Sequence, residues 1–447
     1  MQFTVEQVMG LAPDDSSAKA AKGLVVPAKW PLLGVSDEAL WGECQGSGSK
    51  PYQVQMDLSG PTFRCTCPSR KFPCKHGLAL LLLHTQQRDA FSTSAPPAWV
   101  SEWLALRQQR AAKQEQKKGA EGIGEAAVAD PQAAAKREAR RLERMAAGAA
   151  DLQRWMADQV RQGLANLSLQ GAAMQALAAR MVDAQAPGLA FRIRQMQDIV
   201  DKGGLDWPAR VLAHMGRLQL LLDAFQGKEA LPLSTQADVL AAMGWAVDKE
   251  EVLAQGEQVT DTWIVLGQSM EENAKLWERR VWLRGQSSGR HALLLDFSHG
   301  NRHFEYSFFT GTSVKMKLAF FPGTASLRAL AVNSPETCTG SVTVPQTGPL
   351  DQALINIADF VAANTWQLLL PFFTAEGFVR ARNSGWALQI DGGHSLPLTL
   401  NEDDGWQLTA LGGGAPMTIF GEWNGERLRP LSGWTHALMW TESVRAA

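Results

Sequence analysis

The sequence predicts an α+β protein of several domains: a small β-hairpin and helix module, an all-α middle section, and a β-rich C-terminal domain with at least one helix. A chain of 447 residues is longer than a single hydrophobic core usually stabilises, so several domains are expected. From about residue 131 to 255, apolar side chains recur at the three- and four-residue spacing of helices, and beyond that they alternate as in strands. A polar stretch separates the first module from the helical section.

The N-terminal region, residues 1–95, combines helix and strand signals. The segment DDSSAKAAK near its start predicts a short capped helix. Tyr52–Leu58 alternates apolar and polar side chains, and the segment QGSGSK between it and Leu40–Cys44 is typical of a hairpin turn. The run GLALLLLHTQQR after His76 has no turn residue beyond its first glycine, so we expect a helix packed on the hairpin.

Residues 96–130 are predicted to form a flexible linker, because KQEQKKGAEGIGEAAVADP is polar and has almost no large apolar residue. A helical connector is predicted over residues 131–255. It begins with a long amphipathic helix in which Leu142, Leu152 and Trp155 belong to one apolar stripe. Helical periodicity continues at Met174–Met181, Ile193–Val200, Val211–Phe225 and Val239–Trp245.

The C-terminal domain, residues 256–447, is predicted to be α+β. The segments WIVLG, RRVWLRG, HALLLDFS, FEYSFF, VKMKLAFF and SLRALAV are strand-like and are separated by Gly, Ser and Asn. One helix is expected over Asp351–Leu369. From Phe378 to Trp440 we expect short strands joined by turns at DGG, DDG, GGG and WNGE.

Charge and hydropathy restrict the class of protein. The net charge of −2 excludes a polycation, so any nucleic-acid affinity would need a local basic patch. The longest apolar stretch, Leu78–Leu83, is far shorter than the roughly 18 residues of a membrane span. The N-terminus lacks the pattern of a secretion signal. We therefore expect a cytoplasmic protein without membrane contact, in which cysteines stay reduced and available to metals.

The segment FRCTCPSRKFPCKHGLALLLL contains four residues that can bind a metal. Cys65, Cys67, Cys74 and His76 are all within twelve positions, although the whole chain has only five cysteines. Three thiolates and one imidazole are the number and type of ligands that a closed tetrahedral zinc site takes. The spacing therefore predicts one structural zinc ion (Zn²⁺).

Other interpretations of this segment explain it less well. Buried apolar cysteines would not need the Cys-x-Cys and Cys-x-His spacing. A disulfide is disfavoured in the cytosol and would leave one of the three thiols unpaired. A catalytic zinc ion needs an open coordination position and a nearby general base, but four protein ligands fill the shell and the segment contains no acidic residue.

The pattern Cys-x-Cys-x6-Cys-x-His resembles the SWIM zinc finger. It follows a hairpin, YQVQMDLSGPTFRCTC, and precedes an apolar helix, PCKHGLALLLL, and its core spans residues 50–85. The resemblance implies that Cys65, Cys67, Cys74 and His76 bind zinc. Bacterial proteins with a SWIM finger near the N-terminus have a similar arrangement. For this family both DNA binding and protein binding have been proposed.

Function is expected to be binding rather than catalysis, because the sequence has no phosphate-loop lysine, nucleophile elbow or H-E-x-x-H motif, and no small-molecule substrate is evident. One hypothesis is a DNA-binding protein that uses its basic finger. The alternative is a protein-interaction scaffold or adaptor in a multiprotein assembly, for example one that includes an ATPase. An enzyme within the C-terminal domain is a third hypothesis, less favoured than the other two. The candidate contact residues, for nucleic acid or a protein partner, are Arg64, Arg70, Lys71, Lys75 and Arg88.

Several further residues are weaker candidates. Cys44 is expected to be structural and Cys338 to be a loop thiol. His291, His299 and His303, together with Asp296, could form a metal or acid-base site, but they are more simply explained as polar groups on strands and turns. A basic run lies in the long helix, interrupted by glutamates as expected of a solvated face: Lys136, Arg137, Arg140, Arg141 and Arg144.

Overall fold

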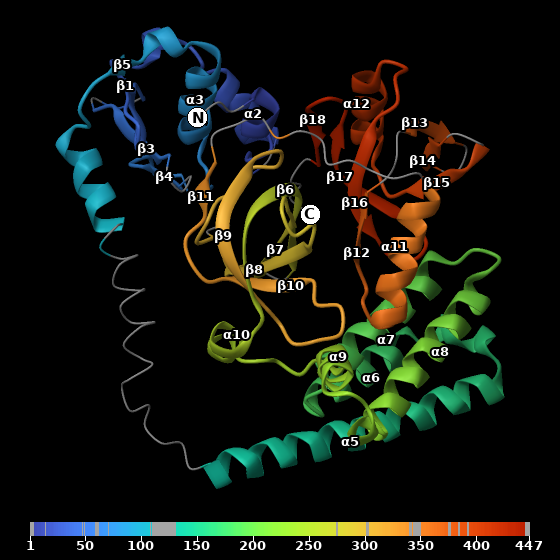
Figure 1. Ribbon diagram of the computed structural model, residues 1–447. Helices are drawn as coiled ribbons and strands as arrows, with labels where there is room; N and C mark the ends of the chain where they lie inside the picture. Colours follow the sequence, from blue (N-terminus) through green and yellow to red (C-terminus); the bar gives the residue numbers. More distant parts are fainter. Residues whose placement is uncertain are drawn as a thin grey trace.

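The computed structural model describes residues 4–442 apart from positions 14, 47, 49, 59–61, 70, 108, 110–130, 274–275, 301–303, 339–341, 343–349, 374–376, 383–384 and 391–392. Figure 1 shows three parts: an N-terminal unit at the upper left, a helical bundle at the lower right, and a β-rich C-terminal domain between and above them. The predicted α+β multidomain class is confirmed.

The N-terminal unit is built on a sheet in the order β4-β3-β2-β1-β5. Its strands are β1 (Leu32–Val35), β2 (Ala39–Cys44), β3 (Tyr52–Asp57), β4 (Thr62–Cys65) and β5 (Ser92–Thr93). Helix α3 (Lys75–Gln86) packs on this sheet, and α1 (Val5–Met9) and α2 (Asp15–Lys22) pack on α3. The predicted hairpin and the helix packed on it are confirmed.

The two faces of this sheet are covered by different helices. Leu40 lies opposite Met56 across the β2–β3 hairpin, and both belong to the apolar core that includes the leucines of α3. Trp41 points to the other face, where it packs with Val100 from a helix over residues 98–107. The two-residue alternation of the strands therefore serves two cores.

The linker predicted over residues 96–130 begins later in the structure. Residues 98–107 are helical, Trp103 and Leu104 are buried, and Arg107 Nε donates a hydrogen bond to Asp57 Oδ2 at 3.1 Å. The apolar residues here have the three- and four-residue spacing of a helix, which the polar composition of the following residues obscured. Residues 110–130 of the predicted linker lie outside the described residues.

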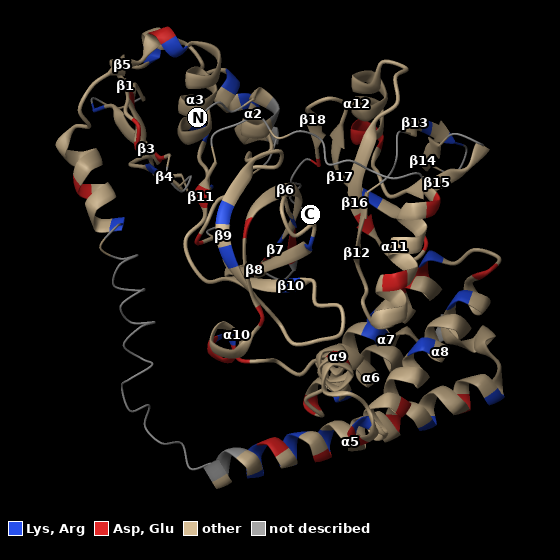
Figure 2. Cartoon of the chain, in the orientation of Figure 1, with Lys and Arg blue, Asp and Glu red and all other residues tan. Residues whose placement is uncertain are grey.

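The helical connector packs around one apolar core, as predicted. Its helices are α5 (Pro131–Gln162), α6 (Gly171–Asp183), α7 (Pro187–Lys202), α8 (Trp207–Gln226) and α9 (Leu233–Met243), followed by the short α10 (Lys249–Gln255). Leu152, Leu177 and Ile193 are among the fully buried residues of this core. Basic and acidic residues alternate along α5 (Figure 2), as expected of a solvated helix face.

In the described part of the C-terminal domain the strands form two sheets. The first has the order β10-β8-β7-β6-β9-β11, and the second β12-β16-β17-β15-β14-β13, with β18 beside β17. The strands of the first are β6 (Gln258–Asn273), β7 (Leu276–Gly285), β8 (His291–His299), β9 (Ser313–Phe320), β10 (Arg328–Ala331) and β11 (Glu336–Thr337). Those of the second are β12 (Leu370–Phe373), β13 (Gly377–Arg382), β14 (Gly385–Ile390), β15 (Ser395–Leu398), β16 (Thr418–Trp423), β17 (Leu428–Trp434) and β18 (Leu438–Thr441).

The two C-terminal sheets share a core. Leu266 and Trp282 of the first sheet are buried in one cluster with Phe420 and Leu431 of the second. A Cβ atom on Gly267 would lie 2.7 Å from the Cβ of Leu431, so this close approach requires glycine.

Three local predictions for the C-terminal domain need correction. The segment FEYSFF is not a strand: adjacent Phe308 and Phe309 are both buried, which a half-exposed strand would not allow. Helix α11 covers Leu350–Ala363 and ends before Leu369. The DDG turn is instead the start of helix α12 (Glu402–Gly412), because Asn401 Oδ1 accepts a hydrogen bond from Asp404 N at 2.9 Å and caps that helix.

The three parts are in contact. Gln7 Nε2 of the N-terminal unit donates to the carbonyl of Thr310 at 3.2 Å. From the C-terminal domain, Asn364 Nδ2 donates to Asp238 Oδ1 of the bundle at 2.9 Å. Arg192 Nη2 of the bundle also donates to the backbone oxygen of Trp366, at 3.1 Å. Among the described residues, no helix combines the length and the apolar character needed to cross a bilayer.

Candidate metal centre

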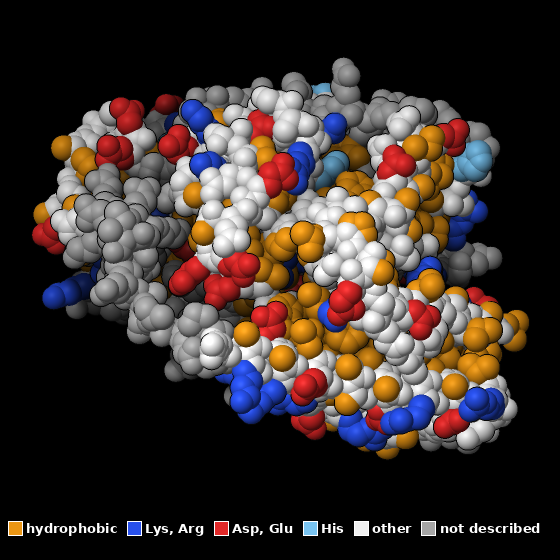
Figure 3. All heavy atoms as spheres, turned by 60° about the horizontal axis from the view of Figure 1, so that its bottom comes forward, with side chains coloured by type: hydrophobic (Ala, Val, Ile, Leu, Met, Phe, Trp, Pro, Cys, Tyr) orange, Lys and Arg blue, Asp and Glu red, His pale blue; other side chains and the backbone are white. Residues whose placement is uncertain are grey.

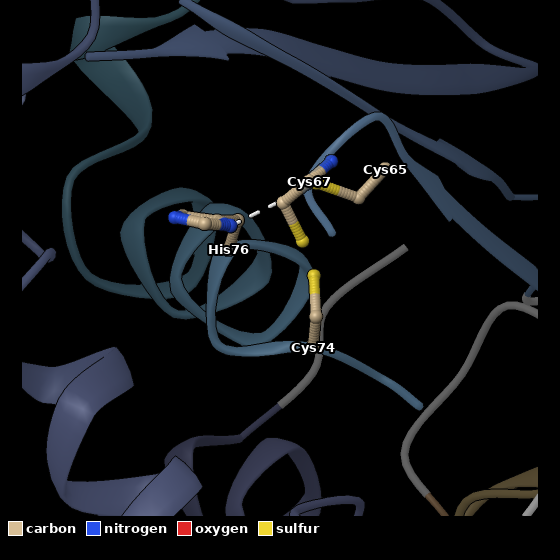
Figure 4. Close-up of side chains that lie close together, drawn as sticks. All are labelled: Cys65, Cys67, Cys74 and His76. Carbon is tan, nitrogen blue, oxygen red and sulfur yellow. Dashed lines mark hydrogen bonds between the residues drawn. The ribbon is translucent and has the colours of Figure 1, made fainter. Parts of the chain in front are cut away.

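The four predicted metal ligands come from three consecutive pieces of structure. Cys65 is the last residue of β4, and Cys67 lies in the turn that follows. Cys74 is the N-cap residue of α3, and His76 lies in the first turn of that helix. An edge strand and a helix start are thereby joined through one group of side chains, as Figure 4 shows.

The ligand atoms are close enough to share one ion. The three Sγ atoms and a ring nitrogen of His76 all lie within 4.8 Å of one another, and Cys65 Sγ is 3.8 Å from His76 Nδ1. In a tetrahedral site with Zn–S bonds of about 2.3 Å and Zn–N bonds of about 2.0 Å, neighbouring ligand atoms are roughly 3.6–3.8 Å apart. The observed group is therefore at most about 1 Å wider than a zinc site requires.

Burial and packing fix the orientation of the ligands. Cys74 and His76 are buried, whereas Cys65 and Cys67 are half-buried. The ring of Tyr52, from β3, lies 4.9 Å from the imidazole of His76. Tyr52 was not predicted to be part of the site, although it begins the strand that precedes the ligands.

Hydrogen bonds among the three cysteines and His76 shift the pKa values of these groups. Hydrogen bonds from Cys65 and Cys74 lower the pKa of Cys67, and the same sharing raises the pKa of Cys65. Burial lowers the pKa of His76, but hydrogen bonds and charge from Cys67 and Cys74 outweigh it and raise the pKa to about 9. Without metal, a thiolate and an imidazolium therefore stabilise each other. A metal ion must displace these protons.

The donor set fits a structural zinc ion. Within the described residues, the metal-binding group consists of three cysteines and one histidine and includes no carboxylate. Thiolate sulfur and imidazole nitrogen are typical zinc ligands, and four of them close the coordination shell. A site of this kind stabilises the fold around it and leaves no position for a reacting water molecule.

Comparison with protein families agrees with this geometry. The model of the SWIM zinc finger matches residues 52–84. This chain contains a SWIM zinc finger. The model of a SWIM-associated four-helix bundle domain matches residues 140–243, within α5 to α9. No match was found among curated proteins or among solved structures.

The SWIM finger includes β3, β4 and most of α3, and the cations predicted to make contacts come from several elements of the N-terminal unit. Arg64 is exposed on the edge strand β4, and Lys75 is exposed at the start of α3. Lys71 Nζ donates to Ser16 Oγ of α2 at 3.1 Å. Arg88 follows the end of α3, about 18 Å from Lys75 along the helix axis. Arg70 lies outside the described residues.

The weaker candidates do not join the SWIM finger's metal group or form a second one among the described residues. Cys44 is buried, and desolvation raises its thiol pKa to about 11. His291 and His299 occupy opposite ends of β8, roughly 26 Å apart, so they cannot share an ion. Asp296 is bound by Arg279 Nε at 3.1 Å. His303 lies outside the described residues.

Proposed function

We propose that this protein is a non-catalytic adaptor that binds another protein in a multiprotein assembly, with the SWIM finger as its zinc-stabilised N-terminal module. The observation that carries this proposal is an apolar stripe along the outer face of α8, in the helical bundle.

The α8 stripe, defined here as Ala209, Leu212, Gly216 and Leu220, has the spacing of one helix face, and Leu205 lies in the turn just before the helix. Leu205, Leu212 and Leu220 are 107%, 52% and 57% exposed. A Cβ atom added at Gly216 would meet nothing within 4 Å, so this face is open along the helix.

The opposite face of α8 already fills the core of the bundle. Val211, Met215, Leu218 and Leu222 are buried there. The α8 stripe is therefore additional apolar surface, which the bundle does not need for its own packing. Figure 3 shows apolar side chains gathered on the bundle above the charged helix α5. Contiguous exposed apolar surface of this kind is typical of protein-binding sites.

DNA binding by the SWIM finger is the second candidate function. It is favoured by the absence of acidic residues from Gly60 to Arg88 in the sequence and by the exposure of Arg64 and Lys75. The distance of about 18 Å between Lys75 and Arg88 along α3 counts against it, because phosphate binding gains from several cations on one surface. A cytoplasmic location is part of the proposal and is supported by the cysteines, all five of which are described and free.

The α8 stripe can be tested directly with paired variants. We expect Leu212→Asp combined with Leu220→Asp to abolish partner capture by the zinc-loaded protein from lysate of its own source cells. Leu411→Asp, at an exposed apolar position of α12, is the matched control and should retain the partner. Captured proteins would be quantified by mass spectrometry, with and without nuclease.

The outcomes separate the two candidate functions. A partner that is lost with the α8 variants, kept with Leu411→Asp and insensitive to nuclease supports the adaptor. Capture that disappears after nuclease treatment and is independent of α8 would instead favour nucleic-acid binding. In that case Arg64→Gln with Lys75→Gln should lower the slope of log affinity against log salt by about 1.4–1.8.

A further inference from the structure

A cavity of about 460 Å³ lies at the edge of the C-terminal domain, far in sequence from the SWIM finger. It is open to solvent and is lined by the β7–β8 hairpin, helix α11 and strand β12, which bring both sheets of the domain to one place. Its size is in the range of pockets that hold small organic molecules. Its lining residues are Arg284, Gly289, His291, Ala325, Ala353, Asn356, Asp359, Phe360, Pro371 and Phe373.

Arg284 provides the cavity with a cationic group that is available for binding. Three nearby arginines are engaged in ion pairs: Arg279 with Asp296, Arg280 with Glu422, and Arg290 with Glu257. The half-buried guanidinium of Arg284, in contrast, has no carboxylate within ion-pair distance among the described residues. A guanidinium with open donors is well suited to bind a planar carboxylate or a phosphate.

His291 lies directly opposite Arg284 in the β7–β8 pairing and also faces the cavity. Burial, with a further effect of the Arg284 charge, lowers the pKa of His291 to about 4. The imidazole is therefore neutral at neutral pH and can donate one hydrogen bond and accept another. In the described part of the chain, neither of its ring nitrogens has a hydrogen-bond partner.

The other residues that line the cavity are suited to bind a planar apolar group. Phe360 and Phe373 line the cavity together with Pro371, and the ring of Phe360 lies 6.5 Å from that of His291 in an edge-to-face arrangement. Asn356 accepts a hydrogen bond from Gln352, which leaves its amide N–H groups to donate. The cavity thus has aromatic side chains and hydrogen-bond donors among its lining residues.

We propose that this cavity binds a small organic anion in which a carboxylate or phosphate group is attached to an aromatic ring. The anionic group would bind Arg284, with a hydrogen bond from His291, and the ring would pack against Phe360 and Phe373. This site is independent of the adaptor function and would make the protein responsive to a metabolite of that class.

Asp359 allows a test of whether the site prefers a negatively charged ligand. Its carboxylate is exposed, lines the cavity, and lies beyond ion-pair distance of Arg284. An anionic ligand is repelled by this group, so removing its charge should leave affinity unchanged or increase it. Removing the charge of Arg284 should have the opposite effect. A non-specific apolar pocket would respond to neither change.

The experiment compares three probes with the same ring: 2-naphthoate, 2-naphthyl phosphate and the neutral 2-naphthalenemethanol. Calorimetric titration of the full-length, zinc-loaded protein should show one site for at least one anion, with a Kd below about 1 mM. The neutral probe should bind at least about tenfold more weakly. A preference between the two anions distinguishes a carboxylate ligand from a phosphate ligand.

Four variants locate the site. Arg284→Gln should weaken anion binding at least about tenfold, Arg284→Lys should retain part of it, and Asp359→Asn should leave it equal or tighter. Arg290→Gln, on the same hairpin but outside the cavity, should have no effect. The proposal is overturned if neither anion binds the wild type below about 1 mM, or if Arg284→Gln and Arg284→Lys, folded by circular dichroism, bind as the wild type does.

Discussion

The SWIM finger and the C-terminal domain each contain a cluster of ionisable groups, but they assemble it in opposite ways. The finger's four ligands lie between Cys65 and His76, within twelve positions of sequence. The C-terminal cluster joins Arg280 to Glu422, 142 residues further along the chain, at the junction of its two sheets. The first cluster is local in sequence, and the second exists only once the two sheets have packed.

The C-terminal cluster balances its own charges. Glu422 is 2% exposed and accepts hydrogen bonds from Arg280 Nε at 2.8 Å and from Trp282 Nε1 at 2.9 Å. Glu271 accepts from Arg280 Nη2 at 2.9 Å and also pairs with Arg429. Opposite charges are thus interleaved, and the buried carboxylate has partners on two sides. Such a cluster needs no ion.

The ligands of the SWIM finger cannot be interleaved with opposite charges once all three thiols are ionised, because thiolates of the same sign are gathered around one point. Three thiolates and a neutral imidazole require a cation, and a zinc ion leaves a net charge of about −1. We therefore expect the finger to depend on a bound zinc ion for folding, and the junction of the sheets to depend on particular side chains.

The largest expected effect is loss of the metal from the SWIM finger. We expect the protein to hold one zinc ion per chain, and Cys67→Ser or His76→Ala to remove it. Zinc-binding energies of about 10–16 kcal/mol are coupled to folding in small metal domains, so residues near 50–85 should unfold while the C-terminal domain persists. Elemental analysis and hydrogen exchange would measure both changes.

The matched control is Cys338→Ser, which changes a half-buried thiol outside the finger and should keep full zinc content. If Cys67→Ser and His76→Ala retained the metal, the ligand assignment would be wrong. If the C-terminal domain unfolded together with the finger, the two clusters would not be independent.

Breaking the C-terminal cluster should have the next largest effect. Glu422→Ala leaves the buried Arg280 without its main partner, and such changes typically lower the free energy of unfolding by about 3–5 kcal/mol. Glu426→Ala, which breaks an exposed pair with Arg210, should cost at most about 1 kcal/mol. Urea denaturation measures both. Equal costs for the two variants would contradict a special role for the buried pair.

On acidification, the zinc site and the C-terminal cluster should lose their stabilising interactions at different pH values. Zinc ligands must be deprotonated, so zinc affinity should fall by about tenfold per pH unit for each displaced proton. Burial opposes ionisation of Glu271, but Arg280 and Arg429 outweigh this and hold its pKa below the ordinary 4.5. Its contribution to stability is present above that ordinary value and is lost only as pH falls through the lower folded pKa.

During acid titration we therefore expect zinc release, followed with a colorimetric chelator, at a higher pH than the loss of near-ultraviolet circular dichroism from the C-terminal domain. Coincident transitions would show that the domain depends on the ion after all.

The smallest expected effect concerns the positive charge beside the zinc site. Lys75 is exposed, so its attraction for the thiolates is screened by solvent. Lys75→Gln should raise the zinc Kd by no more than about fivefold, and added salt should reduce the difference. Competition with a fluorescent zinc chelator can measure this. A much larger loss would mean that Lys75 also positions the ligand loop, and Lys202→Gln in the bundle is the neutral control.

Sequence reasoning predicted the features that depend on neighbouring residues. The alternation of Tyr52–Asp57 and the apolar run after His76 specify a hairpin and a helix, and the cysteine spacing specifies the ligand set. It missed helix α12, because three acidic residues beside a glycine resemble a turn until Asn401 is recognised as an N-cap. It also missed the helix at 98–107, whose apolar residues adjoin a polar stretch.

The sequence by itself therefore determined the zinc ligands, the order of helical and β-rich regions and most individual elements, because spacing along a chain fixes which side chains share a local face. Only the tertiary structure decided the strand order of the three sheets. It also decided the Arg280–Glu422 pair and the cavity around Arg284. These depend on contacts between residues that are far apart in sequence, and no local periodicity encodes which distant strands will meet.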